Sequence, residues 1–154
     1  MRRYKLGKKE LKRIRNIAMI WNIRVEECDV IEESRKKIYL CNDLPYFVEE
    51  NDIIYPTVIA LLNEDNHKIK KVIVNMGAVK PITNGANVFA AGIIDASEDI
   101  MEGDIVGIYD EKYGKPIAVG LAEMNGSDMK NLNKGLAIRN LSHIGDELWK
   151  KFVR

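Results

Sequence analysis

The chain has 154 residues, of which 46% are hydrophobic, and its formal net charge is +1 at pH 7. This length forms one full-sized domain or two small ones, and this apolar content supplies a real core. The near-neutral charge excludes a protein that coats nucleic acid by electrostatics alone. No apolar run approaches the roughly 20 residues of a membrane-spanning helix, and no apolar signal region follows the basic N-terminus, so a cytoplasmic protein is expected.

Positive charge is concentrated at the start of the chain. Residues 1–15 carry eight basic side chains against one acidic, a net charge of +7, and the remainder carries −6. From Gly7 to about Trp21, apolar residues recur at three- and four-residue spacing, which predicts an amphipathic helix with its cations outside. Such a basic patch contacts RNA phosphates or an acidic partner, or is simply a solvated helix face, and the sequence favours neither. Its members are Lys8, Lys9, Lys12, Arg13 and Arg15.

The two cysteines, Cys28 and Cys41, have twelve residues between them and no second cysteine pair or histidine cluster nearby. Neither a zinc site nor a disulfide framework follows from this spacing. We expect both to be ordinary reduced, partly buried cysteines. No metal and no cofactor is therefore predicted.

Short elements follow the first helix. Strands are predicted over 25–31 and 37–41, joined by a charged turn, and a further extended piece over 44–48. Pro56 suits the first turn of a helix in which Val58, Leu61 and Leu62 face inward. The polar run 63–67 reads as a loop and predicts two domains, residues 1–70 and 71–154.

The second half contains more short strands, interspersed with small helices. Such a pattern, without regular strand–helix alternation, predicts an α+β protein whose C-terminal half is a small mixed barrel. The predicted elements are a strand over 71–75, a helix over 78–83, an extended segment over 88–93, a hairpin of 105–109 with 116–121, a helix over 128–133 capped by Ser127, a strand over 136–141 and a helix over 146–152.

Five segments in register resemble the PUA domain, the RNA-binding fold named after pseudouridine synthases and archaeosine transglycosylases. They are Met76–Lys80, Asn84–Val88, Ala91–Ile93, Glu102–Val106 and Pro116–Gly120. The chain departs from the family at Ala91, where a proline usually precedes the Gly-Ile step.

The stretch from Asn133 to Trp149, together with Tyr55–Thr57, is similar to the malignant T-cell amplified sequence family. This resemblance implies a small N-terminal α/β pre-PUA domain followed by a PUA-type pseudo-barrel of mixed strands with short helices. It also implies a role in translation, with tRNA or rRNA of the small ribosomal subunit as ligand. Eukaryotic members pair with the density-regulated protein, so a similar protein partner is implied, and the chain resembles a compact archaeal relative.

By resemblance, RNA lies in a groove formed by the first short helix of the PUA domain and the strand after it. Glycines there let backbone amides approach an RNA backbone, or merely make tight turns. Residues 71–154 hold ten basic and eleven acidic side chains, so shape and backbone contacts should dominate over charge. The predicted RNA-binding residues are Gly77, Ala78, Lys80, Gly85, Ala86, Ala91, Gly92, Ile93, Lys134 and Arg139.

His143 and Asp146 have the chemistry of an acid–base pair, but a packed histidine beside a helix cap is the expected arrangement. The sequence contains no phosphate loop and no metal cluster, and no catalytic residue is predicted. The function predicted is a non-enzymatic RNA-binding protein in translation. The alternative is an RNA-targeting accessory subunit for a tRNA or rRNA modification enzyme. An exposed Tyr113 would be able to stack on a base.

Overall fold

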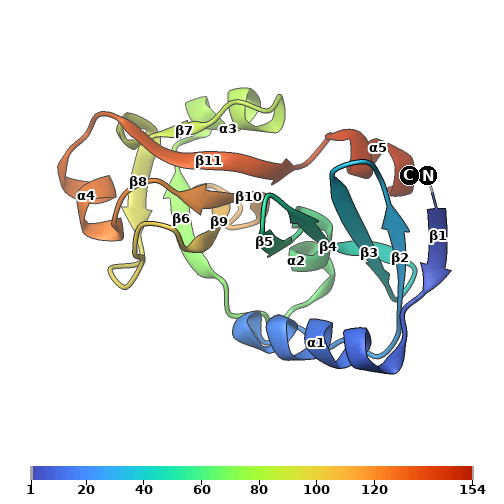
Figure 1. Ribbon diagram of the computed structural model, residues 1–154. Helices are drawn as coiled ribbons and strands as arrows, with labels where there is room; N and C mark the ends of the chain where they lie inside the picture. The colour runs from blue at the N-terminus through green and yellow to red at the C-terminus, as the bar shows by residue number, and fades with distance from the viewer. Residues whose placement is uncertain (1, 154) are drawn as a thin grey trace. The chain divides into compact units, whose positions relative to one another are not determined.

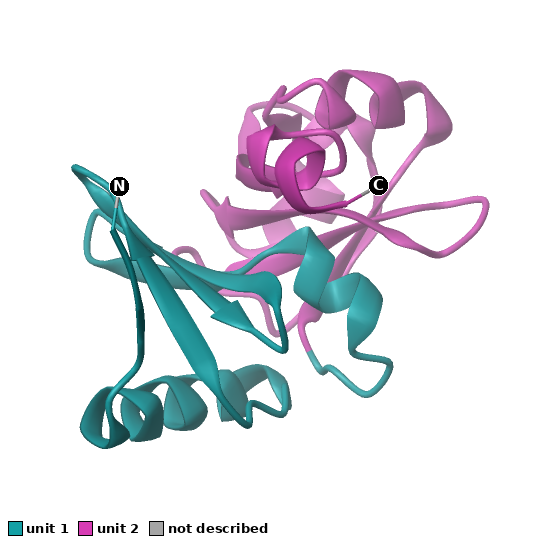
Figure 2. Cartoon of the chain, turned by 90° about the vertical axis from the view of Figure 1, so that its right-hand side faces the viewer, with its two compact units in different colours: residues 1–68 teal, residues 69–154 magenta. Residues whose placement is uncertain are grey.

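The structure, a computed structural model, describes residues 2–153. The chain divides into two compact units, residues 1–68 and 69–154, shown in teal and magenta in Figure 2. The sequence predicted domains of residues 1–70 and 71–154. Each unit has its own sheet, and the α+β class predicted from the sequence is confirmed. Within the described part of the chain, no helix is long and apolar enough to cross a membrane.

The first unit is built on a five-stranded antiparallel sheet in the order β1-β2-β3-β4-β5 (Figure 1). Its hairpins β3–β4 and β4–β5 turn at Asn42-Asp43 and Asn51-Asp52, where all four residues have positive φ. Asn and Asp tolerate this conformation, which two-residue hairpin turns of this kind require. The strands are β1 (Arg2–Lys5), β2 (Cys28–Glu32), β3 (Lys36–Cys41), β4 (Leu44–Glu50) and β5 (Ile53–Pro56).

Helix α1 (Lys8–Ala18) lies along this sheet (Figure 1) and continues as the short 3₁₀ helix η1 (Met19–Trp21). The predicted amphipathic helix is thus confirmed, with Ile14 and Ala18 fully buried. Asn22, with φ 54°, ends it in the left-handed conformation. Strand β1 was not predicted, because its basic residues are exposed and leave no apolar alternation to read.

Helix α2 (Val58–Asn63) begins at Val58, whereas the sequence predicted that Pro56 lies in its first turn. Pro56 is the last residue of β5 and does not open the helix. Thr57 is the N-cap instead, because its hydroxyl accepts a hydrogen bond from the Ala60 amide at 3.2 Å. Val58 and Leu61 are buried, as expected.

Cys28 and Cys41 form a disulfide, so the prediction that they are reduced is wrong. The antiparallel pairing of β2 with β3 places these two residues directly opposite each other, with their Cα atoms 4.3 Å apart. Opposed residues at non-hydrogen-bonded positions of an antiparallel pair come this close. The spacing in sequence does not reveal the pairing, because it depends on the register of the two strands.

The second unit is a six-stranded mixed sheet in the order β7-β11-β10-β9-β6-β8, in which β6 and β9 run parallel. Its core is aliphatic and includes the fully buried Val72, Ile108 and Ile138. The strands are β6 (Lys70–Val74), β7 (Val88–Phe89), β8 (Ile93–Ala96), β9 (Ile105–Asp110), β10 (Pro116–Ala122) and β11 (Leu136–His143).

The helices of the second unit are α3 (Met76–Thr83), α4 (Gly126–Asn131) and α5 (Glu147–Phe152). The predicted extended segment 88–93 is wrong in one respect, because the 3₁₀ helix η2 (Ala90–Gly92) separates β7 from β8. Helix α4 starts earlier than predicted, and Asn125, not Ser127, occupies the N-cap position. Gly126 is buried there, with its amide bonded to the Ile100 carbonyl oxygen at 2.9 Å, and this contact fixes the start of the helix.

Candidate nucleic-acid interface

Helix α3 follows β6 directly and presents one face to solvent. Asn75 is its N-cap, because the side-chain oxygen accepts a hydrogen bond from the Ala78 amide at 3.0 Å. Ile82, 2% exposed, anchors the helix to the core. Gly77 and Lys80 are exposed on the outer side.

The 3₁₀ helix η2 is held between α3 and the start of β11. The Asn75 amide donates to the Gly92 carbonyl oxygen at 3.0 Å, and the Ala90 amide donates to the Gly135 carbonyl oxygen at 2.9 Å. A Cβ atom added at Gly92 would lie 3.4 Å from the Cβ of Ala78, so the two segments are in contact. The structure therefore brings together most of the predicted site. We call this region the α3–η2 surface; it consists of Gly77, Ala78, Lys80, Phe89, Ala91, Gly92, Ile93 and Lys134.

Gly85 and Ala86 lie at the other end of α3, in a loop that β11 holds in place. The side-chain amide of Asn140 donates to the carbonyl oxygens of Ile82 at 3.0 Å and Ala86 at 2.9 Å. Gly85 has φ +97° and faces the His143 ring. A left-handed turn accounts for this glycine, and the loop presents Gly85 and Ala86 as exposed, rigidly held backbone.

Phe89 belongs to this surface, although the sequence reasoning did not select it. Its neighbour Val88 is buried, whereas Phe89 is 56% exposed. Strand β7 is only two residues long and pairs Phe89 with Leu136, so the ring points to solvent from an edge strand. Successive side chains of a strand point to opposite faces, so the buried Val88 implies an exposed Phe89. The sequence shows this only if the strand is known to end at Phe89.

Arg139 lies on β11 and has an acidic partner. Its guanidinium forms an ion pair with the Glu123 carboxylate at 3.0 Å, beside the strand β10 that Arg139 pairs with. Lys80 and Lys134 are exposed, and within the described residues neither side chain has an ion pair. These two lysines are therefore the cations that the surface offers to a ligand.

His143 and Asp146 form a helix cap, as expected. One Asp146 carboxylate oxygen accepts from the Trp149 amide at 2.9 Å, and the other accepts from the His143 amide at 3.0 Å. The His143 Nδ1 atom lies 2.9 Å from the Ile144 carbonyl oxygen. The carboxylate thus contacts the backbone of His143 and not its ring.

The predicted basic patch on α1 divides into two sets. Lys8, Lys9 and Lys12 are exposed. Arg13 makes two hydrogen bonds to the Glu49 carboxylate, at 3.2 and 2.8 Å, and so ties α1 to the sheet. Arg15 donates to the carbonyl oxygens of Val25 at 3.0 Å and Glu26. The two arginines therefore stabilise the fold of the first unit, whereas the three lysines are exposed and able to contact a ligand.

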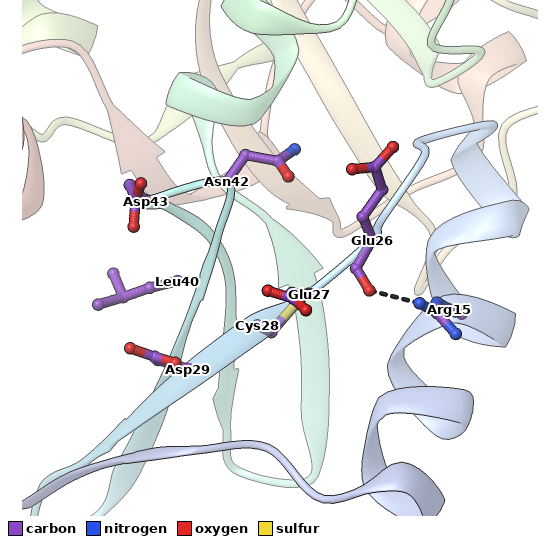
Figure 3. Close-up of a pocket in the computed structure, with 8 residues that line it drawn as sticks. All are labelled: Arg15, Glu26, Glu27, Cys28, Asp29, Leu40, Asn42 and Asp43. Carbon is purple, nitrogen blue, oxygen red and sulfur yellow. Dashed lines mark hydrogen bonds between the residues drawn. The ribbon is translucent and has the colours of Figure 1, made fainter.

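A cavity of about 430 Å³ lies beside Arg15 in the first unit (Figure 3). Its lining includes the carboxylates of Glu26, Glu27, Asp29 and Asp43, while the Arg15 guanidinium is turned to the Glu26 backbone. This negative lining repels phosphate, so the cavity does not suit RNA. Among residues 2–153 there is no group of three or more His, Cys, Asp or Glu side chains that is able to hold a metal ion.

Comparison with known proteins identifies both units. Residues 70–144 match the PUA domain family, and residues 2–64 match a domain of unknown function, DUF1947. The whole chain shares its fold with a conserved PUA domain protein from Thermoplasma acidophilum, at 31% identity and a TM-score of 0.85 over 98% of this chain and 99% of that one. A hypothetical protein from Pyrococcus horikoshii gives 38% identity and a TM-score of 0.84 over 99% and 100%. The chain is a two-domain PUA protein.

Proteins of similar sequence show to which family of PUA proteins the chain belongs. Uncharacterized protein MJ1432 of Methanocaldococcus jannaschii is 38% identical over 96% of this chain and 95% of that protein. Translation machinery-associated protein 20 of Schizosaccharomyces pombe is 31% identical over 79% and 69%. Malignant T-cell-amplified sequence 1 of Rattus norvegicus is 28% identical over 70% and 60%. The chain belongs to the PUA protein family that contains these proteins, which confirms the resemblance found in the sequence.

Proposed function

We propose that this protein is a non-enzymatic RNA-binding factor of the cytoplasm that acts in translation. In this proposal, the α3–η2 surface holds structured RNA, either the acceptor end of tRNA or rRNA of the small ribosomal subunit. The observation that carries the proposal is the convergence on one surface of exposed glycine-lined backbone, an exposed Phe89, and two lysines without ion pairs. Family membership with translation machinery-associated protein 20 supports the placement in translation.

The surface suits a ligand that is read by shape. Backbone at Gly77 and Gly92 carries no side chain to keep a sugar–phosphate chain away, and Phe89 offers a face on which a base stacks. Lys80 and Lys134 supply charge at only two points. RNA-binding proteins recognise unpaired bases and ends in this way, with stacking and backbone contacts more than with a field of cations.

The three exposed lysines of α1 provide a second, electrostatic contact. Lys8, Lys9 and Lys12 lie on the solvent side of the helix. RNA phosphates are the ligand we propose for them, because each neutralised phosphate adds salt-dependent affinity. The family resemblance also implies a protein partner similar to the density-regulated protein.

Fluorescence anisotropy with a labelled tRNA transcript tests the main proposal. Lys80→Glu and Lys134→Glu should each weaken binding about tenfold, because a charge-assisted contact is replaced by repulsion. Lys150→Glu, which reverses an exposed lysine on α5, should bind as the wild type does. Absence of wild-type binding at low salt, together with absence of co-sedimentation with small ribosomal subunits, would make us abandon the proposal.

A second candidate function has one specific observation in its favour. A chain of an H/ACA ribonucleoprotein bound to a substrate RNA matches 64% of this chain at 28% identity, with a TM-score of 0.50 over 29% of its own length. In this alternative, the protein delivers tRNA or rRNA to a modification enzyme. Comparing modified nucleosides between wild-type and deletion cells separates the two, because a translation factor should leave them unchanged.

A further inference from the structure

The loop between β9 and β10 emerges beside helix α3. Strands β6 and β9 are parallel, and their register pairs Val74 with Asp110 at the ends of both strands. Helix α3 follows β6 and the loop follows β9, so both leave the sheet at the same end. The Glu111 carboxylate accepts a hydrogen bond from the Met76 amide at 2.8 Å, which fixes the loop to the first residue of α3. We call residues 111–115 the hairpin tip.

The hairpin tip is held in one conformation by Asp110, which is 5% exposed. One carboxylate oxygen accepts from the Tyr113 amide, and the other accepts from the Lys115 amide at 3.3 Å. Burial acts to raise the pKa of Asp110, but these amide hydrogen bonds outweigh it, and the net pKa is lowered. The group is therefore a carboxylate at neutral pH, and Gly114, with φ +65°, permits the tight turn around it.

The tip presents an aromatic ring and two cations to solvent. Tyr113 is 65% exposed, whereas the other five tyrosines are buried or half-buried. The Lys112 ammonium lies 5.2 Å from the Tyr113 ring centroid, and Lys115 is exposed on the other side of Gly114. The carboxylates of Asp110 and Glu111 are both bonded to backbone amides. Packing does not require this ring. Residues 111–115 carry two lysines against the exposed Glu111, a net charge of +1.

We propose that the hairpin tip is a further RNA contact, in which Tyr113 stacks on an unpaired nucleobase and Lys112 and Lys115 bind the flanking phosphates. This proposal rests on the proposed RNA-binding function and extends the α3–η2 surface past the start of α3. Stacking on an aromatic ring suits any base, and a rigid loop loses little entropy when it binds. A protein partner would need apolar surroundings to bury the ring. The exposed residues of the tip besides Tyr113 are Glu111, Lys112, Gly114 and Lys115, and the exposed apolar residue bonded to the tip is Met76.

The test uses the full chain and a hairpin RNA with four unpaired 3′ nucleotides, one of them 2-aminopurine. The same hairpin with a blunt end serves as the second probe. Tyr113→Ala should weaken binding of the overhang RNA about tenfold, which corresponds to about 1.4 kcal/mol, and should abolish the quenching of 2-aminopurine. Tyr113→Phe keeps the ring and should behave as the wild type. Met101→Ala is the matched control, because Met101 is 60% exposed near the start of β9, at its opposite end.

The outcomes separate this proposal from the function on which it rests. Wild-type affinity in Tyr113→Ala, with Lys134→Glu impaired, overturns the hairpin contact and leaves the proposed function standing. Equal losses in Tyr113→Ala and Tyr113→Phe would mean that the hydroxyl acts and stacking does not, which also overturns it. If Tyr113→Ala instead weakens only the binding of a fluorescent polyglutamate peptide, the tip binds protein and the hairpin contact with RNA is overturned. Failure of the wild type to bind either RNA overturns both proposals.

Discussion

Replacing Arg13 with methionine should destabilise the first unit without weakening RNA binding. Arg13 makes two hydrogen bonds to Glu49, whose Oε1 atom also accepts one from the Tyr39 hydroxyl at 2.7 Å. Hydrogen bonds to charged groups contribute about 1.5–3 kcal/mol when protected from water. The Arg13 side chain is 41% exposed, so screening reduces this, and we expect a loss of about 1–2 kcal/mol.

Urea unfolding of the full chain measures the loss, and hydrogen exchange resolved by peptide locates it in α1 and β4. Lys12→Met is the matched control, because Lys12 is exposed one residue away. We expect Lys12→Met to leave stability unchanged and to weaken RNA binding, which is the converse of Arg13→Met. A double-mutant cycle with Glu49→Gln should show coupling between positions 13 and 49.

The loss of stability caused by Arg13→Met should depend on pH. The hydrogen bonds from Arg13 lower the pKa of Glu49 against the opposing effect of burial. A carboxyl group whose folded pKa is lowered contributes stability above its unfolded pKa and loses it as pH falls through the folded value. The difference between wild type and Arg13→Met should therefore be full at neutral pH and shrink below about pH 4. Equal stabilities at pH 7, or a loss of RNA binding in Arg13→Met that matches Lys12→Met, would refute this reasoning.

Three further predictions concern the disulfide and two glycines. Reduction of Cys28–Cys41 should lower the unfolding free energy by about 3 kcal/mol for a loop of this length, and the double serine variant should no longer respond to reductant in thermal melts. Gly92→Ala should keep the wild-type melting temperature, because its Cβ would meet Ala78 at an ordinary 3.4 Å, yet should lower RNA affinity in anisotropy if backbone approaches RNA there. Gly120→Ala should unfold at clearly lower temperature, because its Cβ would lie 2.3 Å from the Ile138 side chain and 2.5 Å from the Arg139 carbonyl oxygen.

Local patterns in the sequence predicted those elements whose determinants are local. Helix α1 follows from the spacing of its apolar residues, which also predicts that the helical segment ends near Trp21. Asp146 caps α5, next to the half-buried Trp149. The PUA resemblance predicted that the first short helix and the segment after it form one groove, and in the structure α3 contacts η2 at Ala78 and Gly92.

The features that the sequence did not predict depend on contacts between residues far apart along the chain. The disulfide depends on the register of β2 with β3, and the roles of Arg13 and Arg15 depend on partners at residues 49 and 25. Helix periodicity places both arginines on the polar side of α1, but it does not show which polar residues are bonded to the sheet. Arg139 likewise has a partner distant in sequence, because Glu123, which follows β10, forms an ion pair with it.

Phe89 and the hairpin tip show where single-sequence reasoning stops for the candidate site. The exposure of Phe89 cannot be predicted until β7 is known to be only two residues long. The proximity of Glu111 to Met76 follows from the parallel pairing of β6 with β9, across 35 residues of chain. Lys80 and Lys134, in contrast, were predicted and lie on the surface as exposed side chains.

Photocrosslinking of the wild-type protein to cellular RNA, followed by mass spectrometry of the crosslinked peptides, would show which residues of the protein contact RNA. We expect tRNA or small-subunit rRNA to be attached to peptides that contain residues 76–93, the hairpin tip or Lys134. Crosslinks confined to other parts of residues 69–154, or protein that carries no RNA, would contradict the claim that the α3–η2 surface binds RNA.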